Sequence, residues 1–341
     1  MRELVCLISS CIIFFVACGE SKPVEPIAAK YETVCTLKDN LFPINDPKSF
    51  SIISSGEFVI ADGEKVIFYS NEGEQVRCVG ASGNAMGEYN RPTNVKIYND
   101  TVYVWSAMSL KFITYTIFGE PIAEYGYDSA IADFIPSDDV IYIYNSGRSS
   151  ANIIDIYDKK QQKVIKSLTE SDAEHRILLR SWAACPFYLK GDDLYYMSRN
   201  ELNLHKYNLV EDKELFIDYL ESTTFNVERE TDYKSILTDR KKASKYLREN
   251  SCVIGIVPYD EDKLSILALE GQTKVIEDNY DTSDRVIAIY DMNKRKSVSR
   301  YYYDSIGTHV LLCSLNNELY FLKHYIKNDD DVLKLCKLIR K

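Results

Sequence analysis

The residues that could carry chemistry in this sequence are few and far apart. No Gly-x-Ser-x-Gly nucleophile turn, no His-Glu-x-x-His metal motif and no phosphate-binding P-loop occurs in it. The four histidines are widely spaced, at positions 175, 205, 309 and 324. Asp278, Asp281 and Asp284 differ from the Asp-x-Asp-x-Asp-Gly pattern of a calcium loop. Local motifs therefore predict no catalytic residue, no metal ligand and no cofactor.

The N-terminus has the pattern of a targeting segment. Arg2 is followed by a mostly apolar stretch from Leu4 to Ala17. This stretch is shorter than the ~20 residues that span a bilayer, but its length is typical of the hydrophobic region of a signal peptide. A helix buried in the protein core is the alternative. We expect residues 1–17 to be a signal peptide and the chain to be exported.

The end of this segment contains a candidate modification site. Ala17-Cys18 resembles the lipobox of bacterial lipoproteins, with Phe15 at the position where that family usually has Leu. The resemblance implies cleavage before Cys18 and attachment of lipid to its sulfur and amine. Residues 18–30 would then form a lipidated tether to a membrane. We expect a cell-envelope protein, held by its lipid on a membrane and facing either the periplasm or the cell surface.

Nine cysteines allow disulfides or metal sites. Cys6 and Cys11 lie in the expected signal peptide, and Cys18 is the expected lipid site. The others are Cys35, Cys78, Cys185, Cys252, Cys313 and Cys336. Their even number permits disulfides in an exported chain. Most lie in apolar runs and none forms Cys-x-x-Cys, which favours free, buried thiols and gives no indication of zinc.

The composition is that of a folded protein with an acidic balance. The chain has 341 residues, 45% of them hydrophobic and 27% charged, which excludes wholesale disorder. At ~150 residues per domain it could form two domains or one large all-β domain. Its 41 basic and 51 acidic residues give a net charge of -10. This balance lacks the basic footprint of a nucleic-acid-binding protein, so we expect no nucleic-acid partner.

The elements that would position any site are short strands. Twenty-six Tyr and 13 Phe, with many Val and Ile, are typical of β-structure. Groups of strands repeat every ~40 residues, as in a propeller with one four-stranded sheet per blade. The predicted blades cover residues 50–79, 94–125, 131–168, 186–218, 253–302 and 309–338. The last lacks a fourth strand, which residues 31–37 could supply to close the ring.

We therefore predict an all-β fold over residues 31–341: a six-bladed β-propeller of four-stranded blades, with one inserted amphipathic helix. Seven blades or another all-β fold remain alternatives. The helix is expected at about 230–250, where Tyr233, Ile236, Leu237 and Leu247 have helical spacing and Lys and Arg occupy the other face. That basic face is either solvated or a contact for a membrane or a partner.

One connection between the expected blades carries a resemblance. From Val79 to Pro92 the sequence reads Val-Gly-Ala-Ser-Gly-Asn-Ala-Met-Gly-Glu-Tyr-Asn-Arg-Pro. This glycine-spaced stretch is similar to the linker between NHL-type propeller blades. With the lipobox, the chain resembles the six-bladed NHL-like or TolB-like propeller lipoproteins of bacterial envelopes. The fold hosts both enzymes and scaffolds, so the resemblance implies architecture more than function.

Propeller geometry selects a face for ligand binding. Loops from the fourth strand of one blade to the first strand of the next share a face with the loops between second and third strands. On this face the sequence places eight candidates with aromatic, guanidinium or imidazole side chains: Tyr89, Arg91, Tyr127, Arg148, Arg180, Trp182, Arg199 and His309. Aromatic and Arg side chains suit a carboxylate, a sugar or a peptide.

These patterns favour a non-enzymatic binding scaffold over an enzyme. We expect a lipid-anchored envelope propeller that binds a protein, a peptide or a glycan. The alternative is a metal-dependent lyase or hydrolase with its site in the propeller channel. Three or more converging carboxylate, amide or imidazole groups in the channel would favour that alternative.

Overall fold

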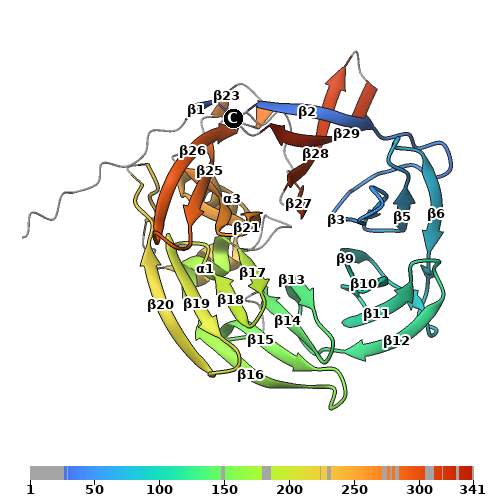
Figure 1. Cartoon of the computed structure of the whole chain (residues 1–341), viewed down its shortest axis with the longest axis horizontal. Helices are drawn as coiled ribbons and strands as arrows, with labels where there is room; N and C mark the ends of the chain where they lie inside the picture. Colours follow the sequence, from blue (N-terminus) through green and yellow to red (C-terminus); the bar gives the residue numbers. More distant parts are fainter. Residues whose placement is uncertain are drawn as a thin grey trace, which may run out of the picture.

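Antiparallel sheets are arranged as six blades around a central axis in the computed structural model (Figure 1). The structure describes residues 27–28, 30–146, 150–178, 186–222, 224–228, 232–270, 275–276, 279–280, 284–303, 311–316, 318–327 and 330–339. Within these residues every blade lies within two residues of its predicted limits. The predicted fold class, an all-β six-bladed propeller with four-stranded blades, is confirmed.

The strands of each blade follow one another from the inside of the ring outward. Blade 1 contains β3 (Ser49–Ile52), β4 (Phe58–Ala61), β5 (Val66–Tyr69) and β6 (Gln75–Val79). Blade 2 contains β9 (Pro92–Tyr98), β10 (Thr101–Ser106), β11 (Lys111–Thr116) and β12 (Pro121–Gly126). Blade 3 contains β13 (Ile131–Pro136), β14 (Val140–Asn145), β15 (Asn152–Asp158) and β16 (Lys163–Glu170).

The second half of the ring repeats this order. Blade 4 contains β17 (Phe187–Lys190), β18 (Asp193–Tyr196), β19 (Asn203–Asn208) and β20 (Lys213–Tyr219). Blade 5 contains β21 (Cys252–Asp260), β22 (Lys263–Glu270), β25 (Asp284–Asp291) and β26 (Lys296–Tyr303). Blade 6 contains β27 (Leu311–Leu315), β28 (Glu318–Lys327), β29 (Asp330–Ile339) and the outer strand β2 (Lys30–Thr36). Two short pairs are added: β7 (Ala81–Ser82) with β8 (Glu88–Tyr89), and β23 (Val275–Ile276) with β24 (Asn279–Tyr280).

Burial within a blade explains why the middle strands were easy to find in the sequence. All residues of β4 and β5 are buried, because both faces of these strands are covered by neighbouring blades. Such strands have nearly continuous apolar sequences. The outer strands are more exposed to solvent, and single apolar residues on them are exposed, such as Val76 on β6 and Ile122 on β12.

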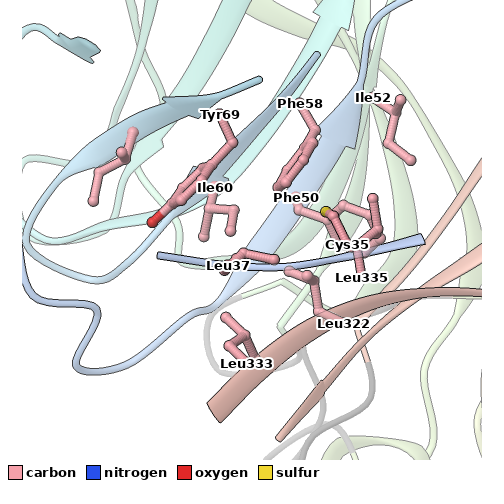
Figure 2. Packing of buried hydrophobic residues seen from close by; sticks show 11 residues of the cluster. Cys35, Leu37, Phe50, Ile52, Phe58, Ile60, Tyr69, Leu322, Leu333 and Leu335 are labelled. Carbon is pink, nitrogen blue, oxygen red and sulfur yellow. The ribbon is translucent and has the colours of Figure 1, made fainter. Parts of the chain in front are cut away.

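The ring is closed by the predicted pairing of the N-terminal and C-terminal strands. β2 pairs antiparallel with β29, with Lys30 opposite Ile339 and Thr36 opposite Lys334. Beyond the strand, the Leu37 N–H donates to the Leu333 carbonyl at 2.9 Å. Figure 2 shows the apolar cluster beneath this seam, where Cys35 and Leu37 pack with residues of blades 1 and 6.

A second N-terminal pairing was not expected from the sequence. β1 (Ile27–Ala28) lies parallel to β26, with Ile27 opposite Tyr301 and Ala28 opposite Tyr302. It is a fifth strand on blade 5 (Figure 1). The chain therefore joins the outer edges of blades 5 and 6 before it reaches blade 1. The end of the expected tether, residues 18–30, thus includes residues that belong to the sheets.

The expected helix is two helices. α2 (Tyr233–Thr238) and α3 (Arg240–Glu249) are separated by Asp239, whose carboxylate accepts the N–H groups of Lys241 and Lys242 at 2.8 and 3.2 Å. A cap of this kind starts a new helix. The expected helix limits at 230–231 and the side chain of Leu237 lie outside the described residues.

A third helix, α1 (Ala173–Leu178), joins them to form what we call the helical cap. The residues packed in its core are Ile177, Leu178, Ile236, Ala243, Tyr246 and Cys252. The basic side chains of Lys241 and Lys245 point to solvent. None of the described helices is long and apolar enough to cross a membrane.

Candidate functional site

Four of the eight predicted ligand-face residues lie in the described part of the chain. Tyr89 and Arg91 share an open groove, whereas Tyr127 and Arg199 are buried elsewhere. The remaining four, Arg148, Arg180, Trp182 and His309, lie outside the described residues, as does Cys18. Arg91 is exposed at the groove and Tyr89 lines it as a buried ring, whereas Tyr127 and Arg199 are interior residues, which corrects their expected placement on the ligand face.

Tyr127 is buried between blades 2 and 3, which corrects its placement on the open face. Its side chain is 5% exposed, and its hydroxyl lies 2.7 Å from Asp155 Oδ2 and 2.8 Å from Asn145 Oδ1. Asn145 Nδ2 also donates to Asp155 at 2.8 Å. Burial raises the pKa of the Tyr127 phenol well above its ordinary value, so it remains protonated. This network satisfies buried polar groups rather than facing a ligand.

Arg199 is also buried, beneath the helical cap, where the sequence placed it on the surface. It has no exposed area, and its guanidinium Nη1 donates to the Val253 carbonyl at 3.4 Å and lies 3.9 Å from Cys252 Sγ. Its backbone N–H donates to His175 Nδ1 at 3.0 Å. Burial lowers the pKa of His175 to about 3, aided by the charges of Arg199 and Arg176. His175 is therefore a neutral acceptor at neutral pH.

Tyr89 and Arg91 line a groove of about 540 Å³ where the connection to blade 2 leaves blade 1, which we call the blade 1–2 groove. Its other walls come from the segment before blade 1, the β4–β5 turn and the end of blade 1: Phe42, Gly63, Glu64, Lys65, Cys78, Gly80, Ala81 and Ser82. The β4–β5 turn and the β6–β9 connection meet here, as expected for the predicted ligand face. The volume is in the range of ligand pockets, roughly 300–1,000 Å³.

The glycine-spaced connection is shaped by one buried tyrosine. The Tyr89 hydroxyl donates to the Val79 carbonyl at 2.9 Å and accepts the Val66 N–H at 3.1 Å. Gly80 passes over this ring with φ of 70°, and a Cβ there would lie 2.7 Å from Tyr89 Cε1 and 2.5 Å from Tyr115 Oη. Only glycine fits both the dihedral angle and the space. The glycine-spaced stretch from Val79 to Pro92 is therefore a connection that Tyr89 holds close to blade 1.

The rest of the connection is held by polar contacts to blade 2. Tyr115 donates its hydroxyl to the Gly87 carbonyl at 2.9 Å, and the Gly87 N–H donates to Glu124 at 2.8 Å. Glu124 is itself paired with Lys111 at 2.8 Å. These contacts fix the connection at both ends, so the groove is formed before any ligand arrives.

Two cations face this groove. Lys65 is half-buried, with its ammonium 4.6 Å from the centroid of the Phe42 ring, and Arg91 is exposed. Among the described residues, neither forms an ion pair with a carboxylate. Glu64 is the one acidic residue in the wall. Burial raises the pKa of the Cys78 thiol, with a smaller opposing effect from Lys65, so Cys78 is a protonated thiol.

The inner strands of the ring show polar groups that bridge neighbouring blades. Ser49 Oγ accepts the Val95 N–H at 2.7 Å, and Asn94 Nδ2 donates to the Ala132 carbonyl at 3.0 Å. Lys96 pairs with Asp133 at 3.0 Å. Within the described part of the chain, no group of three His, Cys, Asp or Glu is placed to hold a metal ion. The channel enzyme therefore stays a prediction.

The described cysteines are free thiols. These are Cys35, Cys78, Cys252, Cys313 and Cys336, and Cys185 lies outside the described residues. Cys35 packs with Leu335 on one face of the closing pair of strands, toward blade 1. Cys336 follows Leu335 on β29 and pairs in register with Thr33, and both Cys35 and Cys336 are free.

Comparison with known proteins supports the architecture. Residues 58–152 match the DUF5128 family, described as a 6-bladed beta-propeller, and this range includes the β6–β9 connection. No curated protein matches the sequence. The fold is similar to a Bacteroides vulgatus protein of the DUF4221 family, with a TM-score of 0.65, 10% identity, and 94% of this chain and 99% of that chain covered.

A second solved structure gives the same result. It is a Bacteroides fragilis protein named for its expected export, with a TM-score of 0.59 and 11% identity. The similarity covers 93% of this chain and 95% of that chain. At these identities the two structures support the fold alone.

Proposed function

We propose that this chain is a lipid-anchored cell-envelope propeller that acts as a non-enzymatic binding scaffold, with its ligand in the blade 1–2 groove. The observation that carries the proposal is the groove itself, which combines two cations with walls fixed from several elements. Its ligand is a protein, a peptide or a glycan. The groove contains no paired acid and base or activated nucleophile among its described residues, because its cysteine is protonated.

The anchoring half of the proposal is supported by the N-terminal sequence. The apolar segment ends at Ala17-Cys18 in a lipobox-like junction. The first described residues then lie on the outer edges of blades 5 and 6, so a tether from Cys18 would leave the ring at its rim. A Bacteroides protein of similar fold is named for its expected export. A rim attachment leaves the blade 1–2 groove open to the surroundings.

Anchoring can be tested with Cys18→Ser in the full chain. We expect the wild-type chain to incorporate a fatty-acid analogue and to sediment with membranes, and the variant to do neither. Cys11→Ser is a matched control inside the apolar segment and should behave like the wild type. A Cys18→Ser chain that is still labelled would contradict the lipid-anchor proposal.

Binding can be tested by filling the groove. Ser82 is exposed on the groove wall, and Ser82→Trp would occupy the space of a ligand. We expect peptides or oligosaccharides selected on arrays with the wild-type chain to bind the variant at least about tenfold more weakly. Glu120→Trp, on the exposed β11–β12 turn, is the control and should leave binding unchanged. Selected ligands that bind Ser82→Trp as tightly as the wild type would refute the proposed site.

A further inference from the structure

We infer that the blade 1–2 groove binds an extended, acidic segment of a partner polypeptide, with a carboxylate held between Lys65 and Arg91. This inference rests on the proposed function and names the ligand class of the same groove. It is carried by the charges in the groove, by the lack of an aromatic face for a sugar, and by the exposed Met108, whose turn is hydrogen-bonded to the backbone at Arg91.

The charge of the groove is opposite to that of the whole chain. The chain carries a net charge of -10, yet two cations and one carboxylate, Glu64, line the groove. Lys65 is held over the Phe42 ring, an interaction that fixes the ammonium without neutralising it. Arg91 supplies a planar donor set that matches a carboxylate. An anionic group is therefore the complementary ligand.

The aromatic residues of the groove do not offer a platform for a sugar ring. Tyr89 is 1% exposed, and its hydroxyl is already bonded to Val79 and Val66. The ring of Phe42 is approached by the Lys65 ammonium. Among the described residues that line the groove, no other aromatic side chain is present. A peptide carboxylate thus fits this wall better than an acidic glycan.

An exposed apolar side chain on a turn bonded to the Arg91 backbone indicates the rest of the ligand. Met108 is 70% exposed. Met108 lies on the β10–β11 turn, which is tied to the connection by hydrogen bonds from the Met108 N–H to the Asn90 carbonyl at 3.2 Å and from the Ala107 N–H to the Arg91 carbonyl at 3.0 Å. Methionine is an adaptable contact for varied side chains. A peptide with acidic and apolar residues would use both features.

The backbone at Arg91 supports a role for its side chain. Arg91 has a φ of 57°, a region that favours glycine. A larger residue held there is strained, and such residues are concentrated at binding and active sites. Arg91 therefore occupies a position where the backbone conformation alone would favour glycine.

The test uses fluorescent octapeptide pools and the full chain. One pool contains Glu and Asp among Leu, Ile and Phe, and the matched pool contains Gln and Asn at the same positions. We expect the acidic pool to bind about tenfold more tightly than the amide pool at low salt. Lys65→Gln combined with Arg91→Gly should remove that preference. Lys163→Gln, an exposed lysine on the outer strand of blade 3, is the control and should preserve it.

The outcomes of this test distinguish a failure of the inference from a failure of the proposed function. Equal binding of the acidic and amide pools, or an acidic preference that survives the double substitution, would overturn the inference. If a uronic-acid oligosaccharide or an uncharged peptide binds instead and is lost in Ser82→Trp, the groove is still a binding site and only its ligand class is wrong. If no pool and no oligosaccharide depends on the groove, both proposals fail.

Discussion

The connections from blade 1 to blade 2 and from blade 4 to blade 5 have the same place in the topology. The first leaves its surroundings open to solvent, whereas the second covers them. The first is short and glycine-spaced, is pinned by Tyr89, and leaves the blade 1–2 groove open. The second contains α2 and α3, which pack with α1, and His175 of α1 contacts the buried Arg199. The loop face of a propeller is therefore not uniform.

The exposure of two arginines, Arg91 and Arg199, illustrates this difference between the two connections. Arg91 is exposed in a groove without a carboxylate partner among the described residues, whereas Arg199 has no exposed area and contacts a carbonyl and a thiol. A buried guanidinium must be satisfied inside the protein, so it is not available to a ligand. Each connection thus determines whether the nearby guanidinium is enclosed by the protein or left open to solvent.

The largest effect on stability is expected from removing the Tyr89 side chain, which holds the blade 1–2 connection in place. Tyr89→Ala would delete a fully buried ring and leave the Val66 N–H without its acceptor. We expect the free energy of unfolding to fall by about 3–5 kcal/mol, measured by chemical denaturation. Phe118→Ala removes an aromatic ring that is 79% exposed and should change stability by less than about 0.5 kcal/mol. Similar values for the two variants would contradict the role given to Tyr89.

The helical cap should be the next most sensitive region. Ile236 is 6% exposed and packs in the core of the cap, so Ile236→Ala should cost about 2–4 kcal/mol. Lys241 is on the exposed side of α3, and Lys241→Ala should cost less than about 0.5 kcal/mol. If both changes are neutral and the amides of α3 exchange as fast as those of an unfolded chain, the cap is not packed as described.

The buried histidine should make the cap sensitive to acid. Burial holds the pKa of His175 at about 3 in the folded chain, against an ordinary value of 6.5. Between these values the unfolded chain binds the additional proton, so the free energy of unfolding falls as the pH drops, by at most about 1.4 kcal/mol per pH unit. Its charged neighbours, Arg199 and Arg176, act in the same direction.

The measurement is the melting temperature from pH 7 to pH 4. His175→Gln keeps an acceptor for the Arg199 N–H but does not titrate, so this variant should lose less stability over that interval than the wild type. Equal slopes for the wild type and His175→Gln would show that His175 is not buried in its neutral form.

The smallest effect is expected at the strained residue of the groove. Arg91→Gly would relieve the backbone at a φ of 57° and should raise the free energy of unfolding by up to about 1 kcal/mol. Lys163→Gly, on the strand β16, offers no such relief and should lower stability. A destabilised Arg91→Gly chain would mean that the Arg91 side chain contributes to stability rather than to binding.

The ring could be predicted from the sequence because each strand is marked by a short run of neighbouring residues. The runs Phe58–Ala61 and Val66–Tyr69 are apolar throughout, since both of their faces are covered, and each is a strand with those limits. The closing pair could be predicted because blade 6 lacked one strand and residues 31–37 had no other partner. The parallel strand β1 has only two residues, too few to form a recognisable pattern.

The candidate site was only partly predictable because exposure depends on residues that are distant in sequence. Tyr89 and Arg91 lie within one motif, and their common location followed from it. Lys65 comes from the β4–β5 turn, and no local pattern linked it to them. Arg199 was misplaced because its buried contacts come from α1 and β21, which lie on either side of blade 4 in the sequence. Apolar helical spacing indicated a packed helix but not what it would cover.

The pairing of β1 and β2 with the outer edges of blades 5 and 6 also fixes how mechanical load would enter the molecule. If Cys18 is lipidated and a partner is bound as proposed, a pull on that partner would be transmitted through the two residues of β1 and then along the seven-residue strand β2. The short parallel pair would yield first, while the longer seam resists by shear along its hydrogen bonds. The same strands that complete the ring would therefore set the force at which an anchored, ligand-bound chain begins to open.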